Sequence, residues 1–186
     1  MTNAQVILLI FAIAAVAAII LVLFNTQRRR RLRRRFGPEY QRAVQQSGNT
    51  ARGEERLSNL EKRVERFNIH PLAASERGRF VEAWRLIQAK FVDDPKGALA
   101  AGDRLLGEIM TARGYPVTDF EQQSADLSVN HSFVVEHYRA GHEIALRHSQ
   151  GRASTEDLRQ AVIHYRRLFD DLVGESEVAP AQTAGR

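Results

Sequence analysis

The feature that most constrains this chain is an uninterrupted apolar run from Val6 to Phe24, VILLIFAIAAVAAIILVLF, without Gly, Pro or any polar side chain. A helix satisfies its own backbone hydrogen bonds, so a helix is the structure that such a run can adopt where water is excluded. At ~1.5 Å per residue the run covers roughly 28 Å, which is close to the ~30 Å hydrocarbon core of a bilayer. It predicts a transmembrane helix over residues 6–24.

The residues on either side of the run favour a retained anchor over a cleaved signal peptide. A signal peptide carries positive charge before its apolar segment and small residues at a cleavage site after it. Here MTNAQ has no charged side chain, and the run is followed by Asn25, Thr26 and Gln27. The arginines that come next indicate the cytoplasmic side, because positive charge is retained there. We therefore expect a single-pass protein of a bacterial inner membrane, with residues 1–5 outside and the C-terminal domain in the cytoplasm.

Seven arginines follow the apolar run within residues 28–35, namely Arg28, Arg29, Arg30, Arg31, Arg33, Arg34 and Arg35. They predict a topology signal that also contacts the anionic headgroups of a lipid bilayer. Nucleic acid is not the expected partner, because no aromatic residues are interleaved for base stacking. Residues 36–186 hold 20 Lys and Arg against 22 Asp and Glu and are slightly acidic, so the net charge of +5 arises from the seven arginines of the arginine segment.

The remainder of the chain reads as a series of amphipathic helices. Pro38 after Gly37 is typical of a helix start, and Asp94 before Pro95 predicts another N-cap. Ser154 or Thr155 is expected to cap the last helix. Apolar residues recur at helical spacing in four segments, and no segment shows the alternation of a strand. The members of these stripes are Leu57, Leu60, Val64 and Phe67; Phe80, Trp84, Ile87 and Phe91; Leu99, Leu105, Leu106, Ile109 and Met110; and Leu158, Ala161, Val162, Tyr165, Leu168, Phe169 and Leu172.

The predicted fold is all-α, with one N-terminal transmembrane helix followed by a small antiparallel helical bundle. The expected organisation is a short N-terminus at 1–5, the transmembrane helix at 6–24 and an Arg-rich juxtamembrane segment at 25–35. These are followed by a helical stalk or first bundle helices at 36–68, a helical domain at 69–174 and a flexible tail at 175–186. The Leu57–Phe67 stripe is too short for a confident coiled coil, so packing on its own domain is expected and self-association is the alternative.

The sequence contains no recognisable catalytic constellation. It has no cysteine, no Gly-rich phosphate loop and no G-x-S-x-G motif, and the HEIAL segment lacks the second histidine of a zinc-protease helix. The predicted helix around His131–His148 places His131 with His142, and His137 with His148, near the apolar arc that includes Phe133. Each pair is ~16 Å apart along the axis, so a ligand site would need donors from another helix. No catalytic, cofactor or metal residue is assigned; His137, His142 and His148 are the polar-site candidates, with packing as the expected role.

Several short sequence segments resemble those of a group of uncharacterised bacterial membrane-anchored helical proteins. They are RFGPEY at 35–40, FVDDP at 91–95, RGYP at 113–116, and STEDLRQA with HYRRLF within 154–169. The resemblance covers most of residues 35–173 and implies a bacterial single-pass protein. It carries no known activity and no functional residue.

The expected function is that of a membrane-tethered helical adaptor or scaffold without a cofactor, which presents an interaction surface to a protein partner or to a second copy of itself. An enzyme, or a metal- or pH-responsive protein that uses the His131–His148 helix, is one alternative. A binder of nucleic acid or anionic lipid through Arg28–Arg35 is the other.

Overall fold

The computed structural model describes residues 3–174, without the side chains of residues 3–11 and 14. The predicted tail at 175–186 lies outside the described residues. Within the described range the chain forms eight α-helices and no strand: α1 (Asn3–Phe36), α2 (Pro38–Ser47), α3 (Thr50–Val64), α4 (Ala74–Lys90), α5 (Pro95–Ala112), α6 (Phe120–Ser128), α7 (Val135–Ser149) and α8 (Thr155–Gly174). The all-α prediction is confirmed. The chain divides into two compact units between Ser58 and Asn59, within α3.

The first unit contains α1, α2 and the beginning of α3. Gly37, at a φ of 48°, separates α1 from α2, and Pro38 occupies the first turn of α2 as expected. The helices α2 and α3 approach closely at Gly53, where an added Cβ would lie 2.9 Å from the Cα of Val44. The buried apolar side chains of this unit are Leu32, Phe36, Tyr40, Ala43 and Leu57.

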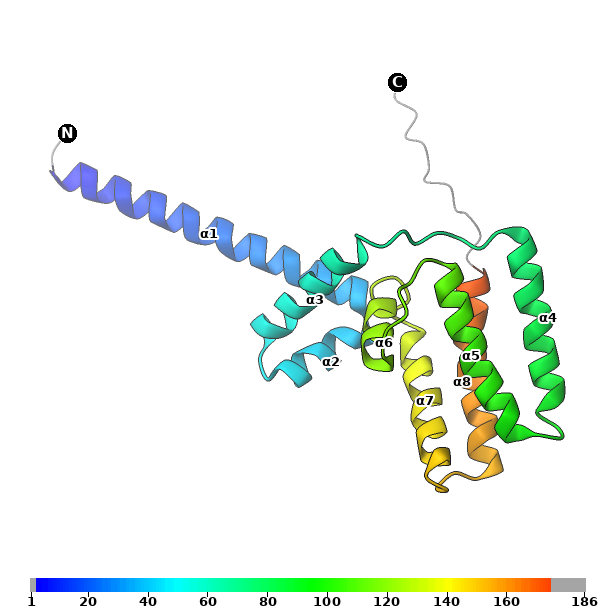
Figure 1. Ribbon diagram of the computed structural model, residues 1–186. Coiled ribbons are helices and arrows are strands. Elements are labelled where there is room, and N and C mark those ends of the chain that lie inside the picture. Colours follow the sequence, from blue (N-terminus) through cyan, green and yellow to red (C-terminus); the bar gives the residue numbers. More distant parts are fainter. Residues whose placement is uncertain (1–2, 175–186) are drawn as a thin grey trace. The chain divides into compact units, whose positions relative to one another are not determined.

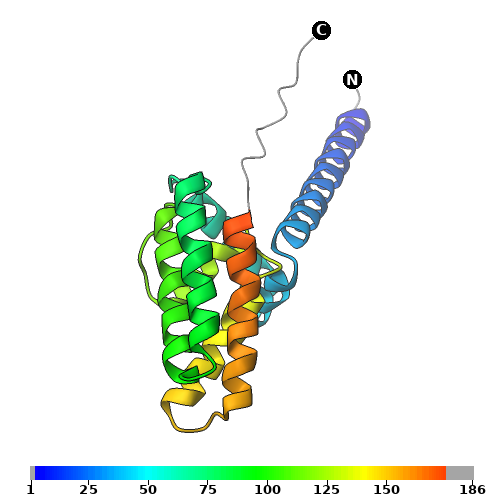
Figure 2. The same ribbon diagram turned by 90° about the vertical axis from the view of Figure 1, so that its right-hand side faces the viewer.

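In the second unit, α4, α5, α7 and α8 run alternately up and down as a four-helix bundle (Figure 1). The α4–α5 and α7–α8 turns lie at the same end, and the short helix α6 connects α5 to α7. Figure 2 shows α4, α5 and α8 side by side along the length of the bundle. Asp94 caps α5 by accepting a hydrogen bond from the Gly97 amide at 2.8 Å.

Three of the four predicted apolar stripes, those of α4, α5 and α8, contribute to the core of this bundle. Trp84 of α4 stacks on Phe169 of α8, with 4.8 Å between ring centroids, and both are buried. Tyr165 of α8 is fully buried and donates a hydrogen bond to Asp103 of α5. The core residues given by the stripes of α4, α5 and α8 are buried or partly buried, as expected, and the complete core also includes Leu72, Tyr115, Leu127, Val135, Tyr138 and Ile144.

The prediction for the histidine-containing helix is wrong at its start. The helix α7 begins only at Val135, and residues 129–134 form turns. A rotation of 100° per residue does not apply through turns, so His131 and His142 do not share a helix face. Phe133, expected in the apolar arc, is 74% exposed.

The structure also contradicts the prediction of a transmembrane helix at 6–24. None of the helices, over the described residues, is long and apolar enough to cross a membrane. The predicted single-pass topology, with its N-terminus outside and its C-terminal domain in the cytoplasm, and the predicted inner-membrane location are corrected accordingly.

Candidate functional site

The arginine segment has two different faces. Within the first unit, Arg28 donates to the hydroxyl of Ser58, Arg29 pairs with Glu54, and Arg33 lies over the ring of Tyr40. The remaining four, Arg30, Arg31, Arg34 and Arg35, line a shallow groove of about 590 Å³ together with Gln27. The sequence did not distinguish these two sets.

Arg29 and Arg33 contact a buried polar pair formed by Tyr40 and Glu54. Tyr40 donates to Glu54 Oε1 at 2.7 Å, and Arg29 Nε lies 3.3 Å from the same oxygen. Burial and the bond to Glu54 raise the pKa of the Tyr40 hydroxyl, although Arg33 acts in the opposite direction. This arrangement gives Arg29 and Arg33 a structural role in holding α1 to α2 and α3.

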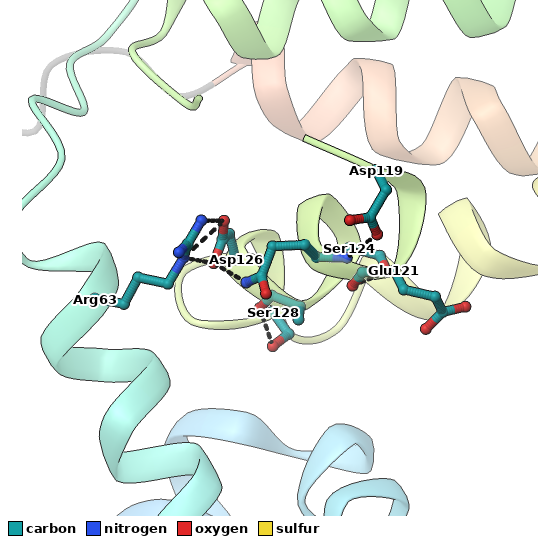
Figure 3. Close-up of polar contacts among 8 residues, drawn as sticks. Arg63, Asp119, Glu121, Ser124, Asp126 and Ser128 are labelled. Atoms are coloured by element: carbon teal, nitrogen blue, oxygen red, sulfur yellow. Dashed lines mark hydrogen bonds and ion pairs between the residues drawn. The ribbon is translucent and has the colours of Figure 1, made fainter. Parts of the chain in front are cut away.

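A second polar cluster surrounds the buried carboxylate of Asp126 on α6 (Figure 3). Arg63 Nε donates to Asp126 Oδ1 at 3.0 Å, and Gln122 Nε2 donates to the same oxygen at 2.8 Å. The hydroxyls of Ser124 and Ser128 donate to backbone carbonyls of their own helix. The cluster therefore fixes α6 to the end of α3 by satisfied hydrogen bonds and presents no catalytic group to a ligand.

His131 Nδ1 shares a hydrogen bond with the carboxylate of Asp171 of α8. A histidine–carboxylate pair can act as a general base where the imidazole reaches a substrate. His131 is only 3% exposed and its Nε2 atom is buried, so it cannot contact a ligand in solution. The pair joins the α6–α7 turn to α8.

The three histidine candidates on α7 have different surroundings in the structure. His142 stacks on Phe120, with ring centroids 3.5 Å apart, and is an aromatic packing residue. His148 has a buried Nδ1 atom without a hydrogen-bond partner among the described residues. His137 instead meets His164 of α8, with 3.1 Å between the two Nδ1 atoms.

The His137–His164 pair brings together two partly exposed metal-ligating side chains from different helices. Burial, and secondarily the charge of His137, lower the pKa of the His164 imidazole and favour its neutral form. The sequence missed His164 because it lies at the polar edge of α8. The register of the α7–α8 hairpin could have revealed it, because residues equally distant from the turn face each other.

No group of three or more His, Cys, Asp or Glu residues within the described part of the chain could hold a metal ion. Comparison with known protein families, with curated proteins and with solved structures finds no match to this chain. The resemblance to bacterial membrane-anchored proteins stays a prediction.

Proposed function

We propose that this chain is a helical adaptor that binds a helix of a partner protein through the apolar part of α1. One observation carries the proposal: between residues 13 and 24, large apolar side chains are exposed on every side of the helix. They are each 56–66% exposed, and comprise Ile13, Val16, Ile19, Ile20, Leu21, Val22, Leu23 and Phe24.

A helix that is apolar all round is stable when other groups cover it. Exposed apolar surface of this extent is typical of interaction sites. On one side of α1, Ala12 and Ala17 alternate with Ile13, Val16 and Ile20 along a groove of about 400 Å³. Small residues beside branched ones leave room for the side chains of an approaching helix.

The charge of α1 favours one kind of partner. The helix continues from its apolar part directly into the arginines. A second copy in parallel orientation would place arginine beside arginine, which is unfavourable. A parallel partner helix with acidic residues after its apolar segment would match both parts of α1, and this is the partner that we propose.

A photo-crosslinking amino acid at Val16 or Ile20 of the full-length protein tests the proposal in cells. We expect one discrete adduct with a different protein, which contains an apolar helix followed by acidic residues and which crosslinks back to this chain when the probe is placed in its own helix. The same amino acid at Val81, an exposed apolar position on α4, is the matched control and should not give this adduct. An adduct of two identical chains, adducts with lipid alone, or no adduct would contradict the proposal.

A second candidate function, binding of a phosphate-bearing polyanion, is favoured by the groove of Arg30, Arg31, Arg34 and Arg35. Guanidinium groups bind phosphate through paired hydrogen bonds. Arg30 and Arg34, and likewise Arg31 and Arg35, are four residues apart, so the groove is lined by two adjacent pairs of charges one helical turn apart.

Binding of a fluorescent single-stranded oligonucleotide, and of vesicles with and without anionic lipid, tests this second function. The double substitution Arg30→Gln and Arg34→Gln should weaken binding at least tenfold and reduce its salt dependence. Arg85→Gln with Arg159→Gln removes the same charge elsewhere and should have little effect. Equal losses in the two variants would show that net charge, and not the groove, is responsible.

A further inference from the structure

The geometry points to a transition-metal site at the His137–His164 pair, in which the two Nδ1 atoms are the protein ligands of one Zn²⁺ or Cu²⁺ ion. This inference does not depend on the proposed partner of α1. It is carried by the meeting of two imidazoles from separate helices, with their Nδ1 atoms 3.1 Å apart.

The distance between the two nitrogen atoms fits shared coordination. Zinc–imidazole bonds of ~2.0–2.1 Å place two nitrogens of a tetrahedral site about 3.3 Å apart. In the square-planar arrangement of Cu²⁺, neighbouring nitrogens at similar bond lengths lie about 2.8 Å apart. The observed separation lies between these values, so either ion requires a shift of only a few tenths of an ångström. The rings are 5.2 Å apart at an angle of 33°, so they converge at Nδ1 and do not stack.

The surrounding structure holds the ligands in place and leaves them accessible. Each histidine lies within a regular helix, and α7 and α8 pack closely because Gly141 allows the ring of Tyr165 to approach. Both imidazoles are partly exposed, so an ion can reach them from solvent.

The site has an open coordination sphere. No third His, Cys, Asp or Glu among the described residues completes it. Water would therefore occupy the remaining positions, and affinity should follow the general order for imidazole ligands, with Cu²⁺ above Zn²⁺ and with no binding of Mg²⁺.

Titration of the full-length protein with Cu²⁺, Zn²⁺ and Mg²⁺ at neutral pH, followed by calorimetry, tests the inference. We expect one Cu²⁺ per chain, weaker Zn²⁺ binding at the same site and no Mg²⁺ binding. His137→Ala and His164→Ala should each lower Cu²⁺ affinity at least tenfold. The electron paramagnetic resonance spectrum of bound Cu²⁺ should lose one nitrogen ligand in either variant.

His70→Ala is the matched control, because His70 is an exposed loop histidine and its removal should leave binding unchanged. Circular dichroism establishes that each variant is folded, and His137→Asn and His164→Asn replace any alanine variant that is not. Absence of Cu²⁺ binding, binding that survives both substitutions, or an equal loss in the His70 variant would overturn the inference. In the first case the two imidazoles share only a hydrogen bond.

Discussion

Tyr165 places a hydroxyl group inside the core of the bundle. Its side chain is fully buried, and its hydroxyl donates to Asp103 at 2.9 Å. Burial, and secondarily the nearby charge of Asp103, raise the pKa of Tyr165 far above its ordinary value of 10. The folded protein therefore keeps this proton at a pH where the unfolded chain has released it.

This difference predicts a loss of stability at alkaline pH. Because the folded pKa is raised, the stabilisation is fully present below pH 10 and is lost as the pH rises above it. The free energy of unfolding should fall by about 1.4 kcal/mol per pH unit for each such tyrosine. Urea titrations over this range should show a smaller fall for Tyr165→Phe than for the wild type. Equal slopes would contradict the prediction.

The buried carboxylate of Asp126 accepts hydrogen bonds from Arg63, and we expect these bonds to contribute to stability. Arg63→Met should lower the free energy of unfolding by about 1–3 kcal/mol, because it removes donors from a buried acceptor while Gln122 still donates to it. Chemical denaturation of Arg63→Met, Asp126→Asn and the double variant measures the coupling. The double variant should be more stable than the sum of the single losses indicates, and strict additivity would argue against the interaction.

At the scale of elements, α5 and α7 approach α8 through glycines that face Tyr165. A Cβ at Gly141 would lie 2.5 Å from two carbons of the Tyr165 ring, whereas a Cβ at Gly102 would make an ordinary contact at 3.5 Å. Because the ring is enclosed by the core, it has little room to move. The separation of α7 and α8 is therefore set by the absence of a side chain at residue 141.

Gly141→Ala should consequently destabilise the bundle by about 1–2 kcal/mol, since overpacking outweighs the gain in helix propensity. Gly107→Ala is the matched control on α5, where an added Cβ meets nothing within 4 Å. That variant should be neutral or more stable by up to about 1 kcal/mol. Thermal unfolding of both proteins distinguishes these outcomes, and a stabilised Gly141 variant would contradict the packing argument.

Local patterns predicted the helices and their caps well, because those depend on neighbouring residues. Asp94 before Pro95, and Ser154 with Asp157, cap their helices through hydrogen bonds over three residues. The contacts of His131 and His164 could not be read locally, because each depends on a residue of another element. For His164 the hairpin register was an available signal: Arg147–Asp157 and Tyr138–Tyr165 lie at nearly the same register as His137–His164.

At the scale of the whole molecule, the division at Ser58–Asn59 predicts two separable unfolding events. Trp84 is the single tryptophan and packs in the second unit, so its fluorescence reports that unit. Tyr40→Phe removes the hydrogen bond to the buried Glu54 and should destabilise the first unit by about 1–3 kcal/mol.

In urea, Tyr40→Phe should change the circular dichroism transition and leave the Trp84 fluorescence midpoint in place. Phe169→Leu, which removes the ring stacked on Trp84, is the positive control and should shift that midpoint. A shift of the fluorescence midpoint in Tyr40→Phe would mean that the two units unfold together.

The apolar run and the arginine segment belong to one continuous helix, from Asn3 to Phe36, whose end is held by the buried Leu32 and Phe36. In a continuous helix the angle about the axis between any two residues is fixed by the number of residues between them. One residue inserted between Phe24 and Arg28 would turn the apolar part by ~100° relative to the arginine groove, whereas seven inserted residues would restore the original angle to within about 20°. The orientation of a partner bound to the apolar part is therefore fixed relative to the groove of Arg30, Arg31, Arg34 and Arg35.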